Sequence, residues 1–313
     1  RKNASIKVGE KFAQFYNELL MLNPGKDKIV NALLVNLVGA FFADSCGLLE
    51  VGSIHNWLEV YCQSDASNLD GILSNVFYLL AGKNDGIPEY MLKKCRKHIS
   101  GLPPYPSGLT FDTSTRKLLI LVSELNWEEV EPEVLGSLIQ SIVNPGESSV
   151  AYNYTSTANI YKVIGPLFMD DLYEQYESRK EVGALDADLL EEINSIRIFD
   201  PACGTGNFLM VCYRELKKLE LQIKKYCNEN GKPYTEKAYV TIEHFYGFES
   251  NPVATVISQM GLAFTAQKYN DTNTDDIVLP VNTVCNGSAL LLDWNAFCPK
   301  ENVKVFIIGN PSY

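Results

Sequence analysis

The 313-residue sequence has only three histidines, no CxxC pair among its eight cysteines and no unbroken apolar run of about 18 residues. The cysteines therefore lack the spacing of a zinc site, and we expect reduced, buried thiols and no bound metal. The lack of a long apolar run predicts no membrane-spanning helix and no membrane partner. Basic charge is also scarce: 27 Lys and Arg face 38 Asp and Glu, a net charge of −11. That balance argues against a self-sufficient nucleic-acid-binding surface.

Two further features are missing. Residues 1–150 contain no nuclease signature of the PD…(D/E)xK kind, and the chain starts at Arg1 without an initiator methionine or a signal-peptide pattern. We therefore expect an excised piece of a longer protein. The densest basic run, residues 93–98 (KKCRKH), is interpreted as a solvated helix face rather than a phosphate-binding patch.

The first half of the sequence has helical periodicity. Residues 29–49 are apolar nearly all round, which is typical of a helix buried among others. Residues 101–108 (GLPPYPSG) form a proline-rich break, and residues 144–149 (NPGESS) form a second turn-rich stretch. We place a domain boundary there, which gives a helical, spacer-like domain at 1–148 and a second domain at 149–313.

The second half alternates strands with helices. Strands are predicted at 196–199, 244–248, within 281–292 and at 303–308, with helices at 208–226 and 252–267 between them. Strands that alternate with helices pair in parallel. The predicted class is therefore α/β, with a helical domain followed by a partial doubly wound, Rossmann-like sheet. We expect the strand order 3-2-1-4, truncated after the fourth strand.

The strongest motif is FDPACGTGNFL, residues 199–209, where a strand ends in an acid and a glycine-rich turn leads into a helix. Such a turn lets the backbone approach a ligand closely and offers the free N–H groups of a helix start. The spacing lacks the third glycine of GxGxxG and the lysine of a phosphate-binding loop. Asp200 before the turn would repel a pyrophosphate but pair with a cationic ammonium.

Two other strand ends carry polar groups. Glu249 closes the second strand, where a carboxylate grips ribose hydroxyls in doubly wound folds. The fourth strand ends in Asn310-Pro311-Ser312-Tyr313, which offers an amide oxygen, a backbone carbonyl and an aromatic plane. Two acceptors beside a flat ring suit a planar –NH2 group attached to a base.

Together these motifs resemble those of the S-adenosylmethionine-dependent amino-methyltransferases. Their motif I is D-P-A-C-G-[ST]-G and their motif IV is [DNS]-P-P-[YFW]. The segment that begins Tyr154-Thr155-Ser156 looks like the motif X of N6-adenine DNA methyltransferases. The motif sequences are most similar to those of the fused type IIG restriction–modification enzymes, and the motif order X, I, IV is that of the γ group. The likeness is specific over about 152–313 and looser in the helical part.

The resemblance implies a cofactor site for S-adenosylmethionine. Its expected members are Tyr154, Thr155, Ser156, Asp200, Pro201, Ala202, Cys203, Gly204, Gly206, Asn207, Glu249, Ser250, Asn251 and Ser288. Within it, Asp200 and the turn 204–207 would hold the methionine end, with Thr155 and Ser156 at its carboxylate. Glu249 would bind the ribose, and Ser250 or Asn251 would line the adenine.

For catalysis the resemblance implies that Asn310 and the Pro311 carbonyl accept hydrogen bonds from the target N6 amino group. Tyr313 would stack on the adenine extruded from double-stranded DNA. Two positions depart from the family pattern. Ser288 stands where motif III usually has an acid, which predicts weaker cofactor binding, and Ser312 replaces the second proline of motif IV.

The predicted function is adenine-N6 methylation of DNA in a cytoplasmic, prokaryotic restriction–modification enzyme, with an endonuclease activity of the parent left open. The DNA-reading domain is expected beyond residue 313 and any nuclease before residue 1, so this piece would bind cofactor weakly and transfer no methyl group alone. Three alternatives stay open: the modification subunit of a type I system, an RNA or protein-glutamine N-methyltransferase, and a non-catalytic fragment.

Overall fold

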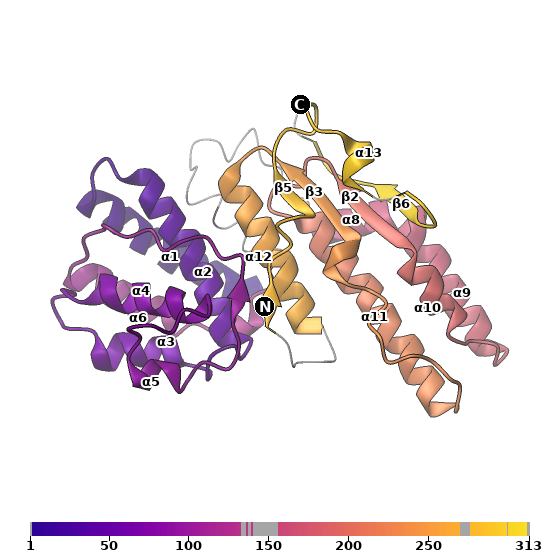
Figure 1. Cartoon of the computed structure of the whole chain (residues 1–313), viewed down its shortest axis with the longest axis horizontal. Helices are drawn as coiled ribbons and strands as arrows, with labels where there is room; N and C mark the ends of the chain where they lie inside the picture. The colour runs from indigo at the N-terminus through magenta and orange to yellow at the C-terminus, as the bar shows by residue number, and fades with distance from the viewer. Residues whose placement is uncertain are drawn as a thin grey trace. The chain divides into compact units, whose positions relative to one another are not determined.

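The computed structural model describes residues 2–132, 136, 139, 156–269, 276–298 and 300–311, with side chains from residue 7 onward. The chain divides into two compact units (Figure 1). One comprises Arg1–Ser149 with Thr272–Leu279, and the other comprises Val150–Asp271 with Pro280–Tyr313. The division assigns residues 272–279 to the first unit, although they follow most of the second unit in the sequence.

The first unit is helical. Its described elements are α1 (Lys2–Leu22), α2 (Asp27–Ser45), α3 (Ser53–Asn56), the π-helical turn η1 (Trp57–Tyr61), α4 (Leu69–Leu80), α5 (Glu89–Leu92), α6 (Thr113–Ser123) and the 3-10 turn η2 (Trp127–Glu129). Trp127 lies at the centre of its core, stacked on Phe41 at 5.0 Å between ring centroids and edge-on to Phe12 at 5.6 Å. Two short strands, β1 (Ile99–Ser100) and β4 (Ile277–Val278), pair in parallel and join the returning segment to this unit.

Helix α2 bears on the expectation drawn from the missing apolar run. Its 19 residues are long and apolar enough to cross a membrane, because scattered polar residues such as Asn31 and Asn36 interrupt the run without lowering its mean hydropathy below 1.3. Most of the helix is buried inside the helical unit. A core helix of a folded unit has the same composition, so α2 is weak evidence for a membrane. The helix ends at Ser45, four residues before the expected end.

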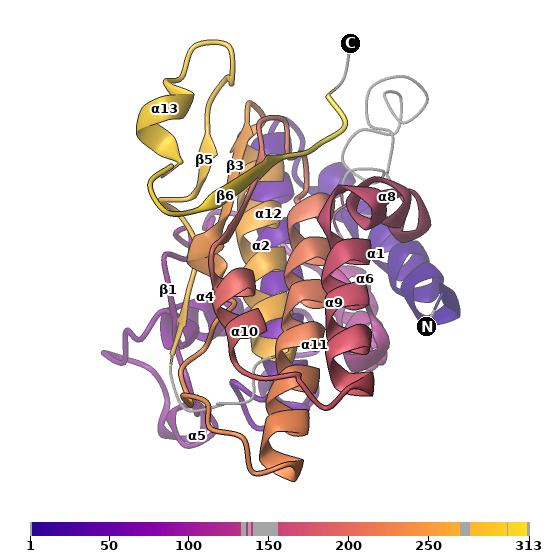
Figure 2. The same ribbon diagram turned by 90° about the vertical axis from the view of Figure 1, so that its right-hand side faces the viewer.

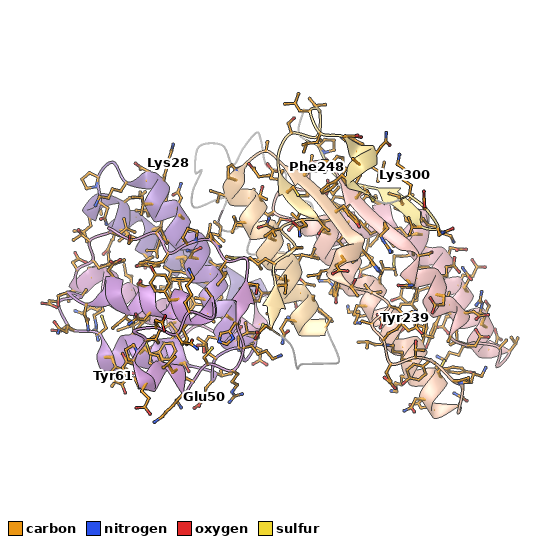
Figure 3. All side chains as sticks on the ribbon, viewed as in Figure 1. Lys28, Glu50, Tyr61, Tyr239, Phe248 and Lys300 are labelled. Carbon is orange, nitrogen blue, oxygen red and sulfur yellow. The ribbon has the colours of Figure 1, made fainter. Side chains whose placement is uncertain are left out.

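The basic run at 93–98 also differs from its interpretation. It begins after α5 ends at Leu92 and is not a helix face: residues 93–94 form a turn, Cys95 forms an isolated bridge, and residues 96–98 are irregular. Acidic partners neutralise part of it: Lys93 contacts Glu89 at 2.7 Å, and Lys94 contacts Glu50, labelled in Figure 3, at 2.6 Å.

The second unit is an α/β sheet, as predicted. Its described elements are α8 (Thr157–Ile164), the π-helical turn η3 (Gly165–Met169), α9 (Asp170–Glu181), α10 (Asp188–Asn194), β2 (Ile196–Asp200), α11 (Asn207–Glu229), the 3-10 turn η4 (Ile242–His244), β3 (Phe245–Glu249), α12 (Pro252–Tyr269), β5 (Val284–Asn286), α13 (Trp294–Phe297) and β6 (Lys304–Ile307). The four strands pair in parallel in the order β5-β3-β2-β6. In chain order this is 3-2-1-4, with β2 as the first strand.

The two faces of this sheet are covered differently (Figure 2). Ile198 and Phe245 point into the large core formed with α11, while their neighbours Phe199 and Phe248 point to the other face. There the short helix α13 covers them, with Phe297 at 4.1 Å from Phe248 and 5.9 Å from Phe199 between ring centroids. Alternation along each strand therefore builds a thick helical layer on one side and a thin aromatic one on the other.

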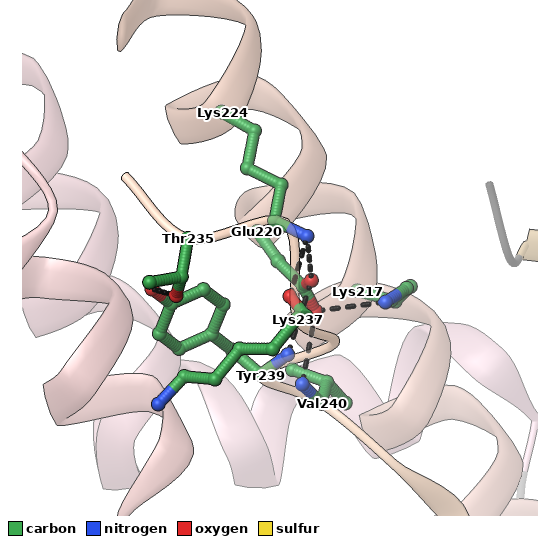
Figure 4. A network of polar contacts seen from close by, with 7 residues as sticks. All are labelled: Lys217, Glu220, Lys224, Thr235, Lys237, Tyr239 and Val240. Carbon is green, nitrogen blue, oxygen red and sulfur yellow. Dashed lines mark hydrogen bonds and ion pairs between the residues drawn. The ribbon is translucent and has the colours of Figure 1, made fainter. Parts of the chain in front are cut away.

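A buried charged network anchors the loop before β3 to α11 (Figure 4). The carboxylate of Glu220, which is fully buried, accepts from Lys217 at 2.9 Å and contacts Lys224 at 2.8 Å. It also accepts from the backbone N–H groups of Tyr239 at 3.2 Å and Val240 at 2.9 Å. These four partners offset the cost of burying the charge. The loop that leads into β3, and hence that strand, is held against the helix that follows β2.

Candidate active site at the carboxyl edge of the sheet

The carboxyl ends of the four strands meet at one edge of the sheet. The register pairs Asp200 with Gly247 and Glu249 with Asn286, and it pairs Phe199 with Ile307. Ligands of open parallel sheets bind at this edge, at the point where the chain reverses its strand order. Here the reversal lies between β2 and β6, where the DPACGTGN turn begins. The motifs identified in the sequence at 200–207, at 249 and near 309 therefore converge.

The turn after β2 depends on two glycines. Gly204 has φ +54° and Gly206 has φ +85°, conformations in which a side chain is strained. A Cβ on Gly206 would also lie 3.1 Å from the Cα of Ser258 and closer still to its hydroxyl. The turn is held by hydrogen bonds from Cys203 N to Phe248 O at 2.9 Å and from Gly206 N to Cys203 O at 2.8 Å. Glycine is required here both for backbone conformation and for close packing against α12.

Asp200 ends β2 with its side chain only 1% exposed. One carboxyl oxygen, Oδ1, accepts from Ala202 N at 3.0 Å and so shapes the start of the turn. Burial raises the pKa of this carboxyl to about 7, and the nearby Glu249 contributes to the rise. A carboxyl in such a place favours the neutral form until a cation arrives, which fits a site for a positively charged group.

Glu249 joins two turns. Its carboxylate accepts from Gly204 N at 2.9 Å, from Asn251 N at 2.7 Å and from the Ser250 hydroxyl at 3.4 Å. The first bond reaches the turn after β2, and the other two stay in the turn after β3. Glu249 is thus hydrogen-bonded to the turn that Asp200 begins, so the two acidic positions predicted from the sequence lie in one site.

The two residues after Glu249 differ in what they offer. Ser250 is exposed, so it is available at the surface of the site. The side-chain oxygen of Asn251 accepts from Val253 N at 2.9 Å and Ala254 N at 3.2 Å, and it thereby caps the start of α12. Its structural role accounts for the residue type without a ligand.

Asn286, at the end of β5, is a site residue that sequence reasoning missed. Its side-chain N–H groups donate to Glu249 O at 2.9 Å, Ser250 O at 3.1 Å and the Thr255 hydroxyl at 3.3 Å. Gly287 N donates to Glu249 O at 2.8 Å as well. Asn286 therefore holds the turn that carries Glu249. The signal was present, since a polar side chain ends β5 as it ends β2 and β3.

Ser288 lies two residues further on and is partly buried. Its hydroxyl accepts from Leu290 N at 3.4 Å, in a turn where Leu290 and Leu291 are 93% and 87% exposed. The contacts described for the Ser288 side chain are local. They leave its expected contact with the cofactor's adenine a prediction.

The fourth strand brings its end to Asp200. Ile308 N donates to Phe199 O at 2.9 Å, which extends the ladder between β6 and β2. A Cβ on Gly309 would lie 3.0 Å from the Asp200 carboxyl carbon. Asn310 and Pro311 follow, both exposed, whereas Tyr313 lies outside the described residues.

The expected motif X residues are described only in part. Tyr154 and Thr155 lie outside the described residues. Ser156 is the N-cap of α8, and its hydroxyl accepts from Asn159 N at 3.3 Å. Its described contacts are with its own helix, so its role at a cofactor carboxylate stays a prediction.

The remaining turn residues fit a polar ligand. Asn207 is the first residue of α11, and its side-chain oxygen is buried without a hydrogen-bond partner among the described residues. A buried acceptor without a partner indicates a missing donor, such as an ammonium or a hydroxyl. Beside it, Pro201, Ala202 and Gly204 are only partly buried, while Cys203 is buried against Ser258. Among the described residues no group of three His, Cys, Asp or Glu gathers as a metal site.

The chain was compared with known proteins. Residues 174–313 match the family described as MmeI, DNA-methyltransferase domain. This part of the chain is similar to that DNA-methyltransferase family. The chain is also 31% identical, over 99% of its length, to DNA methyltransferase A of Bacillus subtilis, of which it spans 37%. These matches confirm the predicted resemblance to methyltransferases of restriction–modification enzymes.

Two further relatives extend the likeness. Over 58% of its length the chain is 27% identical to a putative type II restriction enzyme and methyltransferase of Methanocaldococcus jannaschii, of which it spans 18%. The solved structure of the type IIL restriction–modification enzyme MmeI in complex with DNA superposes with a TM-score of 0.77. That match has 28% identity and covers 98% of this chain and 43% of MmeI. The likeness therefore includes the helical unit, and the chain spans less than half of each relative.

Proposed function

We propose that the sheet unit uses S-adenosylmethionine to methylate the N6 amino group of adenine in double-stranded DNA, as part of a cytoplasmic restriction–modification enzyme. The observation that carries the proposal is the close packing of Gly309 against the Asp200 carboxyl. Because of this contact, the segment leading to Asn310 and Pro311 runs beside the glycine turn. A target amine at Asn310 and a cofactor at that turn would therefore be neighbours.

The cofactor proposal depends on the donor and acceptor groups at the sheet edge. The carboxyl of Asp200 and the unpartnered oxygen of Asn207 would pair with an ammonium, and the backbone of the turn at Gly204 would lie along the ligand. Glu249 has acceptor sites left beside its two backbone donors, which suits ribose hydroxyls. When bound, S-adenosylmethionine supplies an electrophilic methyl group on a sulfonium centre.

The chain's own contribution to the reaction is positioning. The amide oxygen of Asn310 and the carbonyl of Pro311 accept hydrogen bonds from the two N–H groups of the N6 amine. This draws the nitrogen lone pair out of conjugation with the ring and aims it at the methyl donor. Tyr313 stacks on the base, which must leave the duplex for its amino group to be reached. Positioning and electrostatics carry the rate, and the proposal uses no covalent nucleophile.

The alternatives use the same site on other substrates. A type I modification subunit would methylate adenine as well, and an RNA or protein-glutamine methyltransferase would present a different planar amine. The likeness to the DNA methyltransferase A of Bacillus subtilis and to MmeI over nearly the whole chain favours DNA.

The first test is binding of S-adenosylmethionine to these 313 residues by calorimetry, with weak binding expected because Ser288 replaces the usual acid. No heat at millimolar cofactor would contradict the cofactor proposal. Glu249→Gln should weaken binding at least about 10-fold, since it turns one acceptor oxygen into a donor facing backbone N–H groups. Glu59→Gln, on an exposed surface of the helical unit, is the matched control and should bind as the wild type does.

The second test identifies the product. The complete gene product that contains this chain is incubated with labelled cofactor and duplex DNA, RNA or protein, and the methylated nucleosides or residues are identified by mass spectrometry. N6-methyladenine in DNA is expected; methylcytosine, methylated RNA or methylglutamine would overturn the assignment. Asn310→Ala should lower turnover about 100-fold, on the scale of removing one transition-state contact, while cofactor affinity changes less than about twofold.

A further inference from the structure

Gly309 lies where the fourth strand runs past the end of the first. The ladder between β2 and β6 pairs Phe199 with Ile307 and continues through the bond from Ile308 N to Phe199 O. The Asp200 carboxyl, one residue further along β2, then lies against Gly309. The backbone of Gly309 is therefore fixed beside the carboxyl that begins the DPACGTGN turn.

Glycine is needed at this position for space rather than for conformation. Gly309 is not among the glycines of this chain with positive φ, so its backbone would accept any L residue. A Cβ there, however, would lie 3.0 Å from Cγ of Asp200 and 3.4 Å from Oδ2, with Oδ1 nearest of all. The approach to Oδ1 is closer than real Cβ contacts allow and that to Cγ is tight, so one of the two residues must move.

Neither residue has an easy way to move. The oxygen nearest to Gly309, Oδ1, is the one that accepts from Ala202 N at 3.0 Å. The Asp200 side chain is 1% exposed, so it has no solvent-filled space to rotate into. On the other side, the bond from Ile308 N to Phe199 O holds the strand. A methyl group at 309 would therefore displace the carboxyl from the turn or push the strand end, with Asn310, away from it.

We propose that Gly309 is a positioning residue that couples the cofactor turn to the amine-binding segment through its contact with Asp200. The cofactor part of this inference rests on the function proposed above. The contact makes the place of the Asp200 carboxyl and the place of Asn310 depend on each other. A displacement of the carboxyl or of the strand end therefore shifts the other, although the two residues lie far apart in the sequence.

A thermal-melting cycle tests the contact without any ligand. Gly309→Ala should lower the melting temperature by at least about 3 °C when Asp200 is present. In an Asp200→Ala background, where the carboxyl is gone, the same change should cost less than about 1 °C. Equal losses in the two backgrounds would show that the contact does not exist as described.

The matched control is Gly261→Ala. A Cβ there would lie 2.6 Å from the Met210 sulfur, between α11 and α12, so it is also crowded but away from Asp200. Its cost should be the same in the wild-type and Asp200→Ala backgrounds. A background dependence as large as that of Gly309→Ala would mean that the cycle reports general destabilisation, and the proposal would fall.

Cofactor binding tests the functional half and needs only the single variants. Calorimetry with S-adenosylmethionine should show Gly309→Ala weakened at least about 10-fold and Gly261→Ala within about twofold of wild type, both at a temperature where each protein is folded. Wild-type binding together with unchanged affinity in Gly309→Ala would overturn this inference alone. Absence of wild-type binding would overturn the proposed function and the cofactor role of Gly309 with it.

Discussion

Replacing Asp200 by Asn should stabilise this protein at neutral and alkaline pH. The Asp200 carboxyl has its pKa raised from 3.8 to about 7, chiefly by burial. A raised carboxyl pKa means that the folded state resists ionisation that the unfolded chain accepts, so stability is lost as pH rises from 3.8 through about 7. Asn has the same shape, carries no charge and can still accept from Ala202 N, which donates to Asp200 at 3.0 Å.

The size of the effect follows from the two pKa values. Between pH 3.8 and about 7 the wild type should lose about 1.4 kcal/mol of unfolding free energy per pH unit relative to Asp200→Asn. The accumulated difference is roughly 4 kcal/mol above pH 7, and it vanishes below the unfolded value. The variant should at the same time bind S-adenosylmethionine poorly, because it lacks the charge that pairs with an ammonium. Stability gained and function lost together are characteristic of an active-site residue.

Urea denaturation of both proteins at about pH 5, 6, 7 and 8 measures this difference. Glu192→Gln is the control in the same unit, because the hydrogen bond from Lys304 holds the pKa of Glu192 below its ordinary value. A lowered carboxyl pKa stabilises above its unfolded value, so that variant should be less stable than wild type at neutral pH and approach it in acid. A difference between Asp200→Asn and wild type that stays flat across this range, or that grows toward acid, would refute the reasoning.

Three other changes have expected outcomes that thermal melts, urea curves and calorimetry can check. Gly206→Ala should destabilise the protein by about 2 kcal/mol or more, through backbone strain and a clash with Ser258. Gly204→Ala meets no atom within 4 Å and should lose only the roughly 1 kcal/mol that backbone strain costs. Equal losses in the two variants would exclude the clash. Glu220→Gln should cost about 3–5 kcal/mol in urea because it leaves buried Lys217 without its counter-charge, and a loss below about 1 kcal/mol would contradict the network. Asn286→Ala should weaken S-adenosylmethionine binding about 10-fold, since three hydrogen bonds to the turn disappear. Unchanged affinity would show that the turn keeps its shape without them.

Local patterns predicted most of the sheet unit. The β-branched and aromatic run before Asp200 forms β2, the apolar stripe after residue 207 forms α11, and the acid at 249 closes β3. These elements follow from side-chain periodicity and from glycines at positive φ, which act over a few residues. Parallel strands place their carboxyl ends at one edge, so the convergence of the motifs also followed from their order.

Other features depend on contacts between distant residues, and the patterns missed or misjudged them. The basic run at 93–98 was interpreted as a helix face but forms a turn and irregular backbone, because the chain there pairs with Leu49 and leads into β1, the partner of the returning strand β4. The segment 272–279 belongs with the helical unit for the same reason. The role of Asn286 depends on its amide donating to the carbonyls of Glu249 and Ser250, which lie 37 and 36 positions away in the sequence.

The sequence by itself determined the α/β class, the glycine turn and the acidic strand ends, because each is set by neighbours within a few positions. Only the tertiary structure decided which of those groups touch. In that structure Asp200 is buried beside the end of the fourth strand, Glu249 accepts a hydrogen bond from Gly204, and Gly309 has no room for a side chain. The physical reason is that burial and close packing arise between strands far apart in the sequence, and no local sequence pattern indicates how closely those strands pack.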